Sequence, residues 1–147
     1  MHLAALAYVS TAVRPLSTED LEALLVEARD FNQREQVTGA LLHHDGSFFQ
    51  YIEGPPDGLN RVYERIRSSS MHKGLVELIH HRIEKREFST WHMAFAEAPG
   101  SLLQQLAHSQ WADTVPSLQD NASSSAGLAL LLAFWSRTRA GSAYRAP

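Results

Sequence analysis

A hairpin signal near the middle of the chain limits the possible folds more than any other part of the sequence. The dipeptide Asp-Gly at residues 45–46 separates two short apolar runs, residues 37–43 and 47–53. Asp-Gly supplies the positive φ angles of a two-residue β-turn, and each flanking run has the length of a strand. Gly-Pro-Pro at residues 54–56 ends the second strand, because proline has no N–H to give to a sheet. The sequence therefore predicts an antiparallel strand pair over residues 37–53.

A strand and a helix are expected before this hairpin. Residues 3–10 form a short apolar run, which is typical of a buried strand. Ser17 and Asp20 have the spacing of a capping box, so a helix should begin there. That helix carries an apolar stripe that ends in an amide: Leu21, Leu24, Leu25, Ala28, Phe31 and Asn32.

A helix and two strands are expected after the hairpin. Apolar residues at helical spacing predict a helix over residues 59–66, a strand is expected at residues 75–83, and residues 88–95 are expected to contain a short fifth strand. The last strand should place Trp91 and Met93 on one face. The resulting order, βαββαββ, is the ferredoxin-like α+β arrangement, a mixed sheet with two helices on one face.

Residues 98–147 are expected to form a C-terminal helical extension to a domain over residues 1–97. Two apolar stretches, residues 102–111 and 128–135, predict its helices, and a Ser-rich connector over residues 116–127 joins them. Two helices on one face leave the other face of the sheet uncovered. The extension is expected to pack on that face, and packing on a second subunit is the alternative.

The composition bounds the partners and the compartment. Charged residues make up 20% of the chain and the formal net charge is −3, which indicates no basic patch for nucleic acid or for an anionic membrane. The N-terminus lacks the basic region of a signal peptide, and the longest apolar run, residues 128–135, is too short to span a bilayer. A cytoplasmic protein without nucleic-acid or membrane partners is expected.

Metal and thiol chemistry are not expected. The chain has no cysteine, which removes disulfides and thiol nucleophiles. Two histidine pairs, residues 43–44 and 80–81, lie in expected strands, where neighbouring side chains point to opposite faces. Neither pair can easily hold one ion, so no metal site is predicted.

Three polar side chains fall on surfaces that should be apolar. Gln50 lies between apolar neighbours on one strand face, Tyr8 lies on an apolar strand face, and Asn32 ends the helical stripe. Alone, Tyr8 can be a core aromatic, Asn32 the last residue of its helix, Gln50 a satisfied core amide and Met93 a gap filler. Together they would form a polar edge in an apolar slot, which suits a flat heteroaromatic ring.

Four segments resemble the BLUF family, sensors of blue light that use FAD. They are Tyr-Val-Ser at residues 8–10, the stretch from Asn to Gly at residues 32–39, Phe-Phe-Gln-Tyr-Ile-Glu-Gly at residues 48–54 and Trp-His-Met-Ala-Phe at residues 91–95. Each segment is weak evidence alone, but their order and spacing also match. The resemblance covers residues 2–97.

The resemblance implies a non-covalently bound flavin and a light-driven hydrogen-bond switch. Tyr8 corresponds to the electron and proton donor. Gln50 corresponds to the glutamine that rotates or tautomerises between Tyr8 and the flavin N5 and C4 carbonyl edge. Asn32 corresponds to the side chain that holds the C4 carbonyl and N3 side of the ring. Trp91 and Met93 correspond to strand residues that report the switch, one or the other lying near Gln50.

The same resemblance makes FAD the expected cofactor, with FMN and riboflavin left open. Arg29 and His72 are the candidates for contact with the flavin tail. The chain departs from the residues common in the family at three positions expected near the flavin tail and ring rim: Asp30, Phe31 and Met71. The contacts with the phosphates of the tail are therefore not assigned further. The family includes short members that signal through a downstream protein partner, and this chain is expected to do so as a homo-oligomer.

Two other classes of protein are alternatives to a flavin-binding light sensor. A light-independent ferredoxin-like interaction module would keep the fold and bind no flavin. An enzyme similar to the small ferredoxin-like acylphosphatases would need catalytic side chains at a suitable spacing. The sequence offers no nucleophile with a base, no phosphate-binding glycine loop and no carboxylate pair. The chain is therefore not expected to be an enzyme.

Overall fold

The computed structural model describes residues 2–89, 92–109, 111, 126–139 and 144–145. Its strands are β1 (Leu3–Ala12), β2 (Thr38–His44), β3 (Ser47–Gly54), β4 (His72–Ile83), β5 (Ala94–Glu97) and β6 (Tyr144–Arg145). Its helices are α1 (Thr18–Glu35), α2 (Pro56–Ser68), α3 (Gly100–His108) and α4 (Ala126–Arg139). The expected order of elements from β1 to β5 is confirmed.

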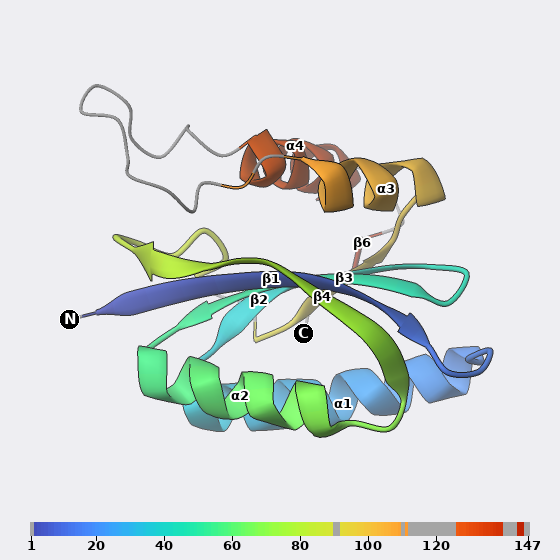
Figure 1. Ribbon diagram of the computed structural model, residues 1–147, viewed down its shortest axis with the longest axis horizontal. Helices are drawn as coiled ribbons and strands as arrows, with labels where there is room; N and C mark the ends of the chain where they lie inside the picture. Colours follow the sequence, from blue (N-terminus) through green and yellow to red (C-terminus); the bar gives the residue numbers. More distant parts are fainter. Residues whose placement is uncertain (1, 90–91, 110, 112–125, 140–143, 146–147) are drawn as a thin grey trace.

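The strands form one mixed sheet in the order β4-β1-β3-β2-β5-β6. β1 pairs antiparallel with β3 and β4, β2 pairs antiparallel with β3, and β2 pairs parallel with β5. α1 and α2 lie along one face of the sheet, and α3 and α4 cover the opposite face (Figure 1). The fold is the α+β, ferredoxin-like arrangement that the sequence predicts, with a C-terminal helical extension.

Capping interactions set the ends of α1. The Ser17 hydroxyl accepts a hydrogen bond from the Asp20 N–H at 3.0 Å, and the Asp20 carboxylate accepts one from the Ser17 N–H at 3.0 Å. This is the expected capping box. Gln36 closes the helix in the left-handed conformation, with a φ of 61°. Asn32 therefore lies inside the last turns of α1 and is not the residue that ends it.

The β2–β3 hairpin turns where the sequence predicts. Asp45 and Gly46 have φ angles of 48° and 83°, as a two-residue hairpin turn requires. Gly39 on β2 lies opposite Ile52 on β3. A Cβ at this position would overlap the carbonyl oxygen of Tyr51, so the close approach of the two strands requires glycine here.

Two apolar cores lie on the two faces of the sheet. The core under α1 and α2 includes Leu6, Leu25, Leu41, Ile52, Leu59 and Val62. The core under α3 and α4 includes Leu42, Phe49, Ile79, Leu103, Leu106 and Leu131. Alternation along β1 and β3 assigns Leu6, Tyr8, Phe48 and Ile52 to the first core and Phe49 and Tyr51 to the second.

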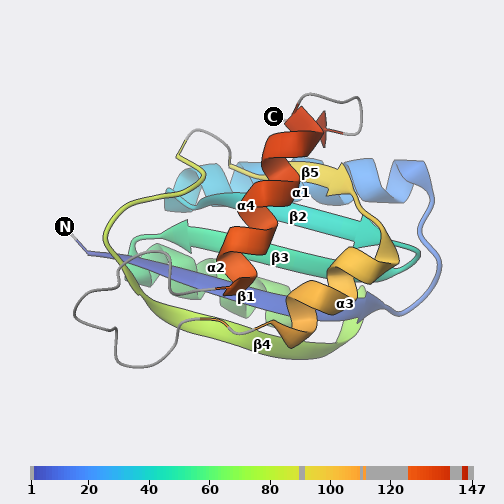
Figure 2. The ribbon, with the colours of Figure 1, turned by 90° about the horizontal axis from the view of Figure 1, so that it is seen from above.

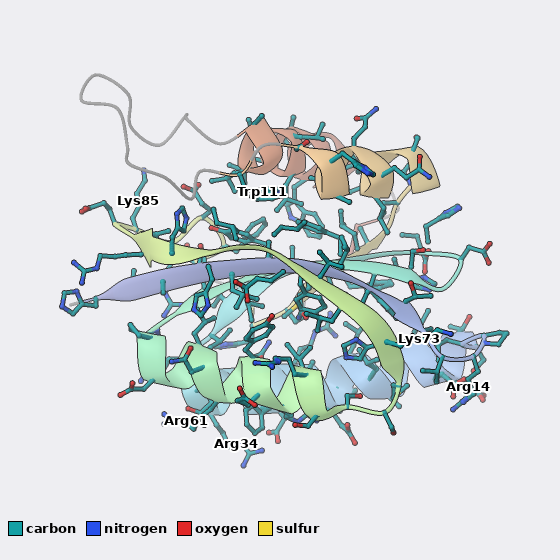
Figure 3. The ribbon with its side chains drawn as sticks, viewed as in Figure 1. Arg14, Arg34, Arg61, Lys73, Lys85 and Trp111 are labelled. Atoms are coloured by element: carbon teal, nitrogen blue, oxygen red, sulfur yellow. The ribbon has the colours of Figure 1, made fainter. Side chains whose placement is uncertain are left out.

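The C-terminal extension packs on the sheet face that α1 and α2 leave open. α4 crosses over the strands when the molecule is seen from above (Figure 2). Trp111 lies between the α3–α4 layer and the sheet (Figure 3). Its ring stacks on Phe49 and Tyr51, with centroid distances of 5.7 Å and 6.4 Å. A Cβ on Gly127 of α4 would overlap the Trp111 indole, so the helix and the ring are in close contact.

The short strand expected within residues 88–95 is found at the end of that range and continues beyond it, because β5 runs from Ala94 to Glu97. β5 begins at Ala94, because the chain before it is held by side chains and not by a strand ladder. The Phe88 N–H donates to a carboxylate of β3, and the carbonyls of His92 and Met93 accept from side chains of α1.

The extension also differs from the expectation in detail. The helix expected at residues 102–111 is α3, which ends at His108. The last two residues of the connector expected at residues 116–127 belong to α4, and its earlier part lies outside the described residues. β6 pairs antiparallel with β5 and was not anticipated, since two residues are too few to show a period.

Within the described part of the chain, no helix is both long and apolar enough to cross a membrane. The same residues contain no group of three or more His, Asp or Glu side chains placed to hold a metal ion.

Candidate functional site

A cavity of about 490 Å³ lies between the sheet and the layer formed by α1 and α2. Its apolar walls are Leu24, Ala28, Leu41, Phe48, Val62, Ile66 and Met71. Its polar lining consists of Tyr8, Ser10, Glu27, Asn32, Gln50, Arg65, Ser68, Ser69, Ser70 and His72. The volume and the mixed lining are typical of a site for a small organic molecule.

Tyr8 and Gln50 form the polar centre of this site. They are directly opposite each other in the β1–β3 ladder, so their side chains lie side by side on one face. The Tyr8 hydroxyl donates a hydrogen bond to Oε1 of Gln50. Both side chains are buried. Strand alternation predicts the shared face, and the register brings the two groups into contact.

The Gln50 amide has a second neighbour, Met93. Nε2 of Gln50 lies 3.3 Å from Sδ of Met93, which is a weak acceptor. Met93 is fully buried and directly precedes β5. If the amide reversed, its oxygen would face a sulfur that cannot donate, while its NH₂ would face a hydroxyl that can turn to accept. Both orientations of Gln50 can pair with Tyr8, and only the present one also donates to Met93.

Two side chains of α1 hold the chain just before β5. Nδ2 of Asn32 donates to the His92 carbonyl at 2.7 Å, and Nε of Arg29 donates to the Met93 carbonyl at 2.9 Å. A carbonyl only accepts, so the NH₂ group of Asn32 must face His92, and Oδ1 is left as its acceptor. Arg29, expected as a contact for a ligand tail, is not among the residues that line the cavity.

His72 forms part of the cavity wall at the start of β4. Its Nε2 lies 2.8 Å from the Ile66 carbonyl, so Nε2 carries the proton and Nδ1 is an acceptor. Nδ1 is buried and has no hydrogen-bond partner among the described residues. The ring stacks on Tyr8, with centroids 6.2 Å apart and an angle of 26°. A buried acceptor of this kind fits a ligand that brings a hydrogen-bond donor.

Burial keeps the phenol of Tyr8 neutral. The pKa of Tyr8 is raised well above its ordinary value by burial first, and by the neighbouring Tyr63 second. Its proton therefore stays in the bond to Gln50 at neutral pH. An unpaired charge in such surroundings is unfavourable, so an electron leaves Tyr8 most easily when the proton leaves as well.

Arg65 of α2 was not anticipated from the sequence. It lines the cavity, and its guanidinium lies 3.1 Å from the Glu27 carboxylate and 5.1 Å from the centroid of the Phe31 ring. The helical period carried a signal, since Arg65 follows Val62 by three residues and so lies on the same side of α2. Trp91 lies outside the described residues, and its expected role stays a prediction.

The lining as a whole fits a flat ring with a polar rim. The amides of Gln50 and Asn32 offer donors and acceptors together, and His72 Nδ1 offers a further acceptor. The apolar walls given above supply contact for the rest of such a ring.

The sequence of this chain is similar to those of known photoreceptors. The profile of the BLUF family, described as "Sensors of blue-light using FAD", matches residues 3–94. Two relatives from Euglena gracilis, photoactivated adenylate cyclase subunit beta-like protein FB and photoactivated adenylate cyclase subunit beta, are 34% and 36% identical over 97 and 95 residues. These matches cover 65% and 64% of the chain but only 11% of each relative. The chain thus spans about a tenth of their length.

Solved structures give the same result. The dark-state structure of BlrB, a BLUF protein, has a TM-score of 0.63 at 26% identity, covering 65% of this chain and 73% of that one. A bacterial light-regulated adenylyl cyclase has a TM-score of 0.63 at 28% identity, covering 70% and 31%. BlrP1 of Klebsiella pneumoniae, solved with FMN and cyclic diGMP, has a TM-score of 0.60 at 30% identity, covering 65% and 26%.

The family match spans β1 to β4, helices α1 and α2 and the residues that line the cavity, and the Tyr8–Gln50 pair is part of that lining. The chain belongs to the BLUF family of flavin-binding blue-light sensors.

Proposed function

We propose that the cavity between the sheet and the α1–α2 layer holds the flavin ring, and that Tyr8 and Gln50 are its light-driven switch. The observation that carries the proposal is the hydrogen bond from the Tyr8 hydroxyl to Gln50 Oε1 in the cavity wall. Asn32 and Gln50 would hold the polar rim of the ring, since both amides line the cavity. Met93 would be the reporter of the switch, because its sulfur contacts the Gln50 amide.

The flavin, when bound and excited by blue light, supplies a strong one-electron oxidant. Tyr8 is the side chain suited to donate that electron, because a phenol gives up one electron readily and becomes a strong acid when it does so. Its proton can then pass along the existing hydrogen bond to Oε1 of Gln50. A proton gained at Oε1 and matched by one given up from Nε2 towards the bound ring would leave the tautomeric form of the amide, and either this change or a rotation would alter the group that faces Met93.

The switch requires that the new arrangement outlasts the electron transfer. When the electron and proton return to Tyr8, Gln50 keeps its altered orientation. It returns to the first orientation only when it crosses the energy barrier between the two. Two arrangements that differ by a few kcal/mol are enough for such a bistable element. The weak Nε2–Sδ contact at 3.3 Å supports this account, since little is lost when Gln50 leaves Met93.

FAD is the flavin we propose, and two residues support a contact with its tail. His72 Nδ1 would accept from a hydroxyl of the tail, because it is a buried acceptor without a partner among the described residues. Arg65 would meet a phosphate, since its guanidinium lines the cavity and its side chain is 40% exposed. Arg29 stays a prediction for the same role, and its Nε is engaged with the Met93 carbonyl.

The signal is proposed to leave through contacts with a partner protein. Residues 1–97 would be the sensor and residues 98–147 the extension through which it acts, in a cytoplasmic homo-oligomer. The relatives are cyclases by name, but we propose no catalytic activity for the 147-residue chain itself. In the described cavity lining, Glu27 is the one carboxylate, and it is paired with Arg65.

The experiment is an absorption spectrum of the chain, purified with its flavin or reconstituted with FAD, before and after blue light. A flavin band that shifts to the red and recovers in the dark is the expected result. A band that only bleaches would leave a flavoprotein without this switch. A chain that takes up no flavin would contradict the proposal altogether.

A further inference from the structure

A buried carboxylate lies on the far face of the sheet, outside the flavin cavity. Glu53, near the end of β3, is 0% exposed. A carboxylate is rarely buried so fully unless it has a partner. Its Oε2 accepts a hydrogen bond from the backbone N–H of Phe88 at 2.5 Å. Phe88 belongs to the segment that connects β4 to β5, so Glu53 binds that segment to β3.

Arg86 provides a second attachment for the same segment. It donates to Oγ1 of Thr38 at 2.8 Å, to the backbone carbonyl of Glu53 at 3.2 Å and to the carbonyl of Gln36 at 2.7 Å. The connection between β4 and β5 is thus tied to β2, to β3 and to the residue that closes α1. These bonds take the place of a strand ladder before β5.

Phe88 contacts both the sheet and the C-terminal extension. Its ring lies 5.8 Å from Tyr51 of β3 and 5.9 Å from Trp135 of α4, meeting the indole nearly edge-on at 85°. The side chain is 4% exposed and belongs to the core under α3 and α4. The backbone of Phe88 is therefore fixed by Glu53, while its ring forms part of the surface on which α4 packs.

The same segment ends at the photoswitch. Five residues after Phe88 the chain reaches Met93, whose sulfur faces Nε2 of Gln50. Gln50 and Glu53 are on the same strand and on opposite faces of the sheet. The β4–β5 connection thus touches the Gln50 amide at Met93 and α4 at Phe88, and Glu53 binds it at Phe88.

We propose that Glu53 is a positioning residue that couples the photoswitch to α4. Because Glu53 fixes the backbone of Phe88 to β3, a change at Met93 would be felt in the packing of the Phe88 ring against Trp135. The inference rests on the proposed function, since it takes the Gln50–Met93 contact as the one that light changes. The output it assigns is the docking of α4 on the sheet.

The test is amide hydrogen exchange of the α4 peptides in the full flavin-loaded chain, in the dark and under blue light. The wild type should show different exchange of α4 in the two conditions. In Glu53→Ala the flavin band should still shift to the red, but α4 should exchange about fivefold or more faster in the dark, and the light–dark difference should vanish. Glu53→Gln should restore wild-type behaviour, because its amide oxygen still accepts from the Phe88 N–H.

Phe88→Leu is the variant to measure by the same hydrogen exchange if Glu53→Ala fails to bind flavin. It keeps the backbone bond to Glu53 and loses the ring contact with Trp135, so it should also lose the light–dark difference at α4. The control is Glu97→Gln, which changes a carboxylate of β5 that contacts His43 at 2.8 Å, away from this segment, and should behave as the wild type does.

Three outcomes would overturn the proposal. They are a wild type that shifts its flavin band with no change at α4, a Glu53→Ala variant that keeps the wild-type difference, and a Glu53→Gln variant that behaves like Glu53→Ala. A wild type with no spectral shift would instead contradict the proposed function.

Discussion

Tyr8 and Gln50 face each other across the β1–β3 ladder, and the Tyr8 hydroxyl donates to Oε1 of Gln50 within the wall of a cavity of about 490 Å³. Adjacent strands fix both backbones, so the bond depends on two side chains that have little freedom to part. A proton can move along this bond without any movement of the fold. The proposed switch therefore lies on two adjacent strands of the sheet.

Removing the hydroxyl of Tyr8 should separate flavin binding from switching. Tyr8→Phe keeps the buried ring and loses the proton and its bond to Gln50. We expect flavin to bind, the red shift to disappear and the free energy of unfolding to fall by about 1 kcal/mol. Absorption spectra and urea denaturation measure both effects. Tyr63→Phe is the control, since the Tyr63 hydroxyl donates to Glu77 at 3.0 Å, and a lost shift in that variant would contradict the assignment.

Arg65 should distinguish flavins by their phosphates. Arg65→Ala removes a guanidinium from the cavity lining, so the Kd for FAD and FMN should rise about tenfold while the Kd for riboflavin stays unchanged. Fluorescence titration of the apoprotein with the three flavins measures this. Arg61→Ala is the matched control on α2, because Arg61 pairs with Glu35 and does not line the cavity. Equal losses for all three flavins would show that Arg65 supports the fold and does not bind phosphate.

Close packing of α4 on Trp111 should make Gly127 intolerant of a side chain. Gly127→Val places atoms where the indole lies, so the thermal midpoint should fall, with a loss of about 1–3 kcal/mol in the free energy of unfolding. Ala129→Val, at an exposed position of the same helix, is the control and should cost less than about 0.5 kcal/mol. Equal stability of the two variants would mean that α4 is not docked as described.

Glu53 should make the stability depend on pH with a definite sign. Burial raises the pKa of Glu53 above its usual 4.5, against the lowering effect of the Phe88 and Glu87 N–H groups, and the nearby Glu87 carboxylate adds to the rise. A raised folded-state pKa stabilises the protein below the unfolded value and loses that effect as the pH rises through the folded value. The free energy of unfolding of the wild type should therefore fall relative to Glu53→Gln as the pH rises above about 4.5. Urea denaturation at a series of pH values checks this, and a constant difference would contradict it.

Much of the fold and the centre of the site follow from local signals in the sequence. Strand alternation places Tyr8 and Gln50 on the same face of the sheet, and the Asp-Gly dipeptide at residues 45–46 fixes the hairpin that joins β2 to β3. The capping box at Ser17 fixes the start of α1. The helical stripe places Asn32 towards the sheet, where it is 2% exposed.

The rest depends on contacts between distant parts of the chain. The length of β5 could not be predicted, because the segment before it is held by Arg29, Asn32 and Arg86 from elsewhere in the fold and not by its own periodicity. The burial of Glu53 could not be predicted from the sequence, since a charged residue at the end of a strand normally faces solvent. Arg29 stays a prediction for contact with the ligand tail, and its bond to the Met93 carbonyl and the place of Arg65 in the cavity lining depend on the tertiary structure.

The central claim is that the Gln50 amide is what light rearranges, and the most direct test is the light-minus-dark absorption difference of Gln50→Leu beside that of the wild type. Leucine keeps the size and burial of the side chain and removes the amide that joins Tyr8 to Met93. Ser10→Ala, on the same strand as Tyr8 and in the same cavity wall, is the control. The account predicts bound flavin in all three proteins, with a reversible red shift in the wild type and in Ser10→Ala and none in Gln50→Leu. A reversible red shift of normal size in Gln50→Leu would contradict it.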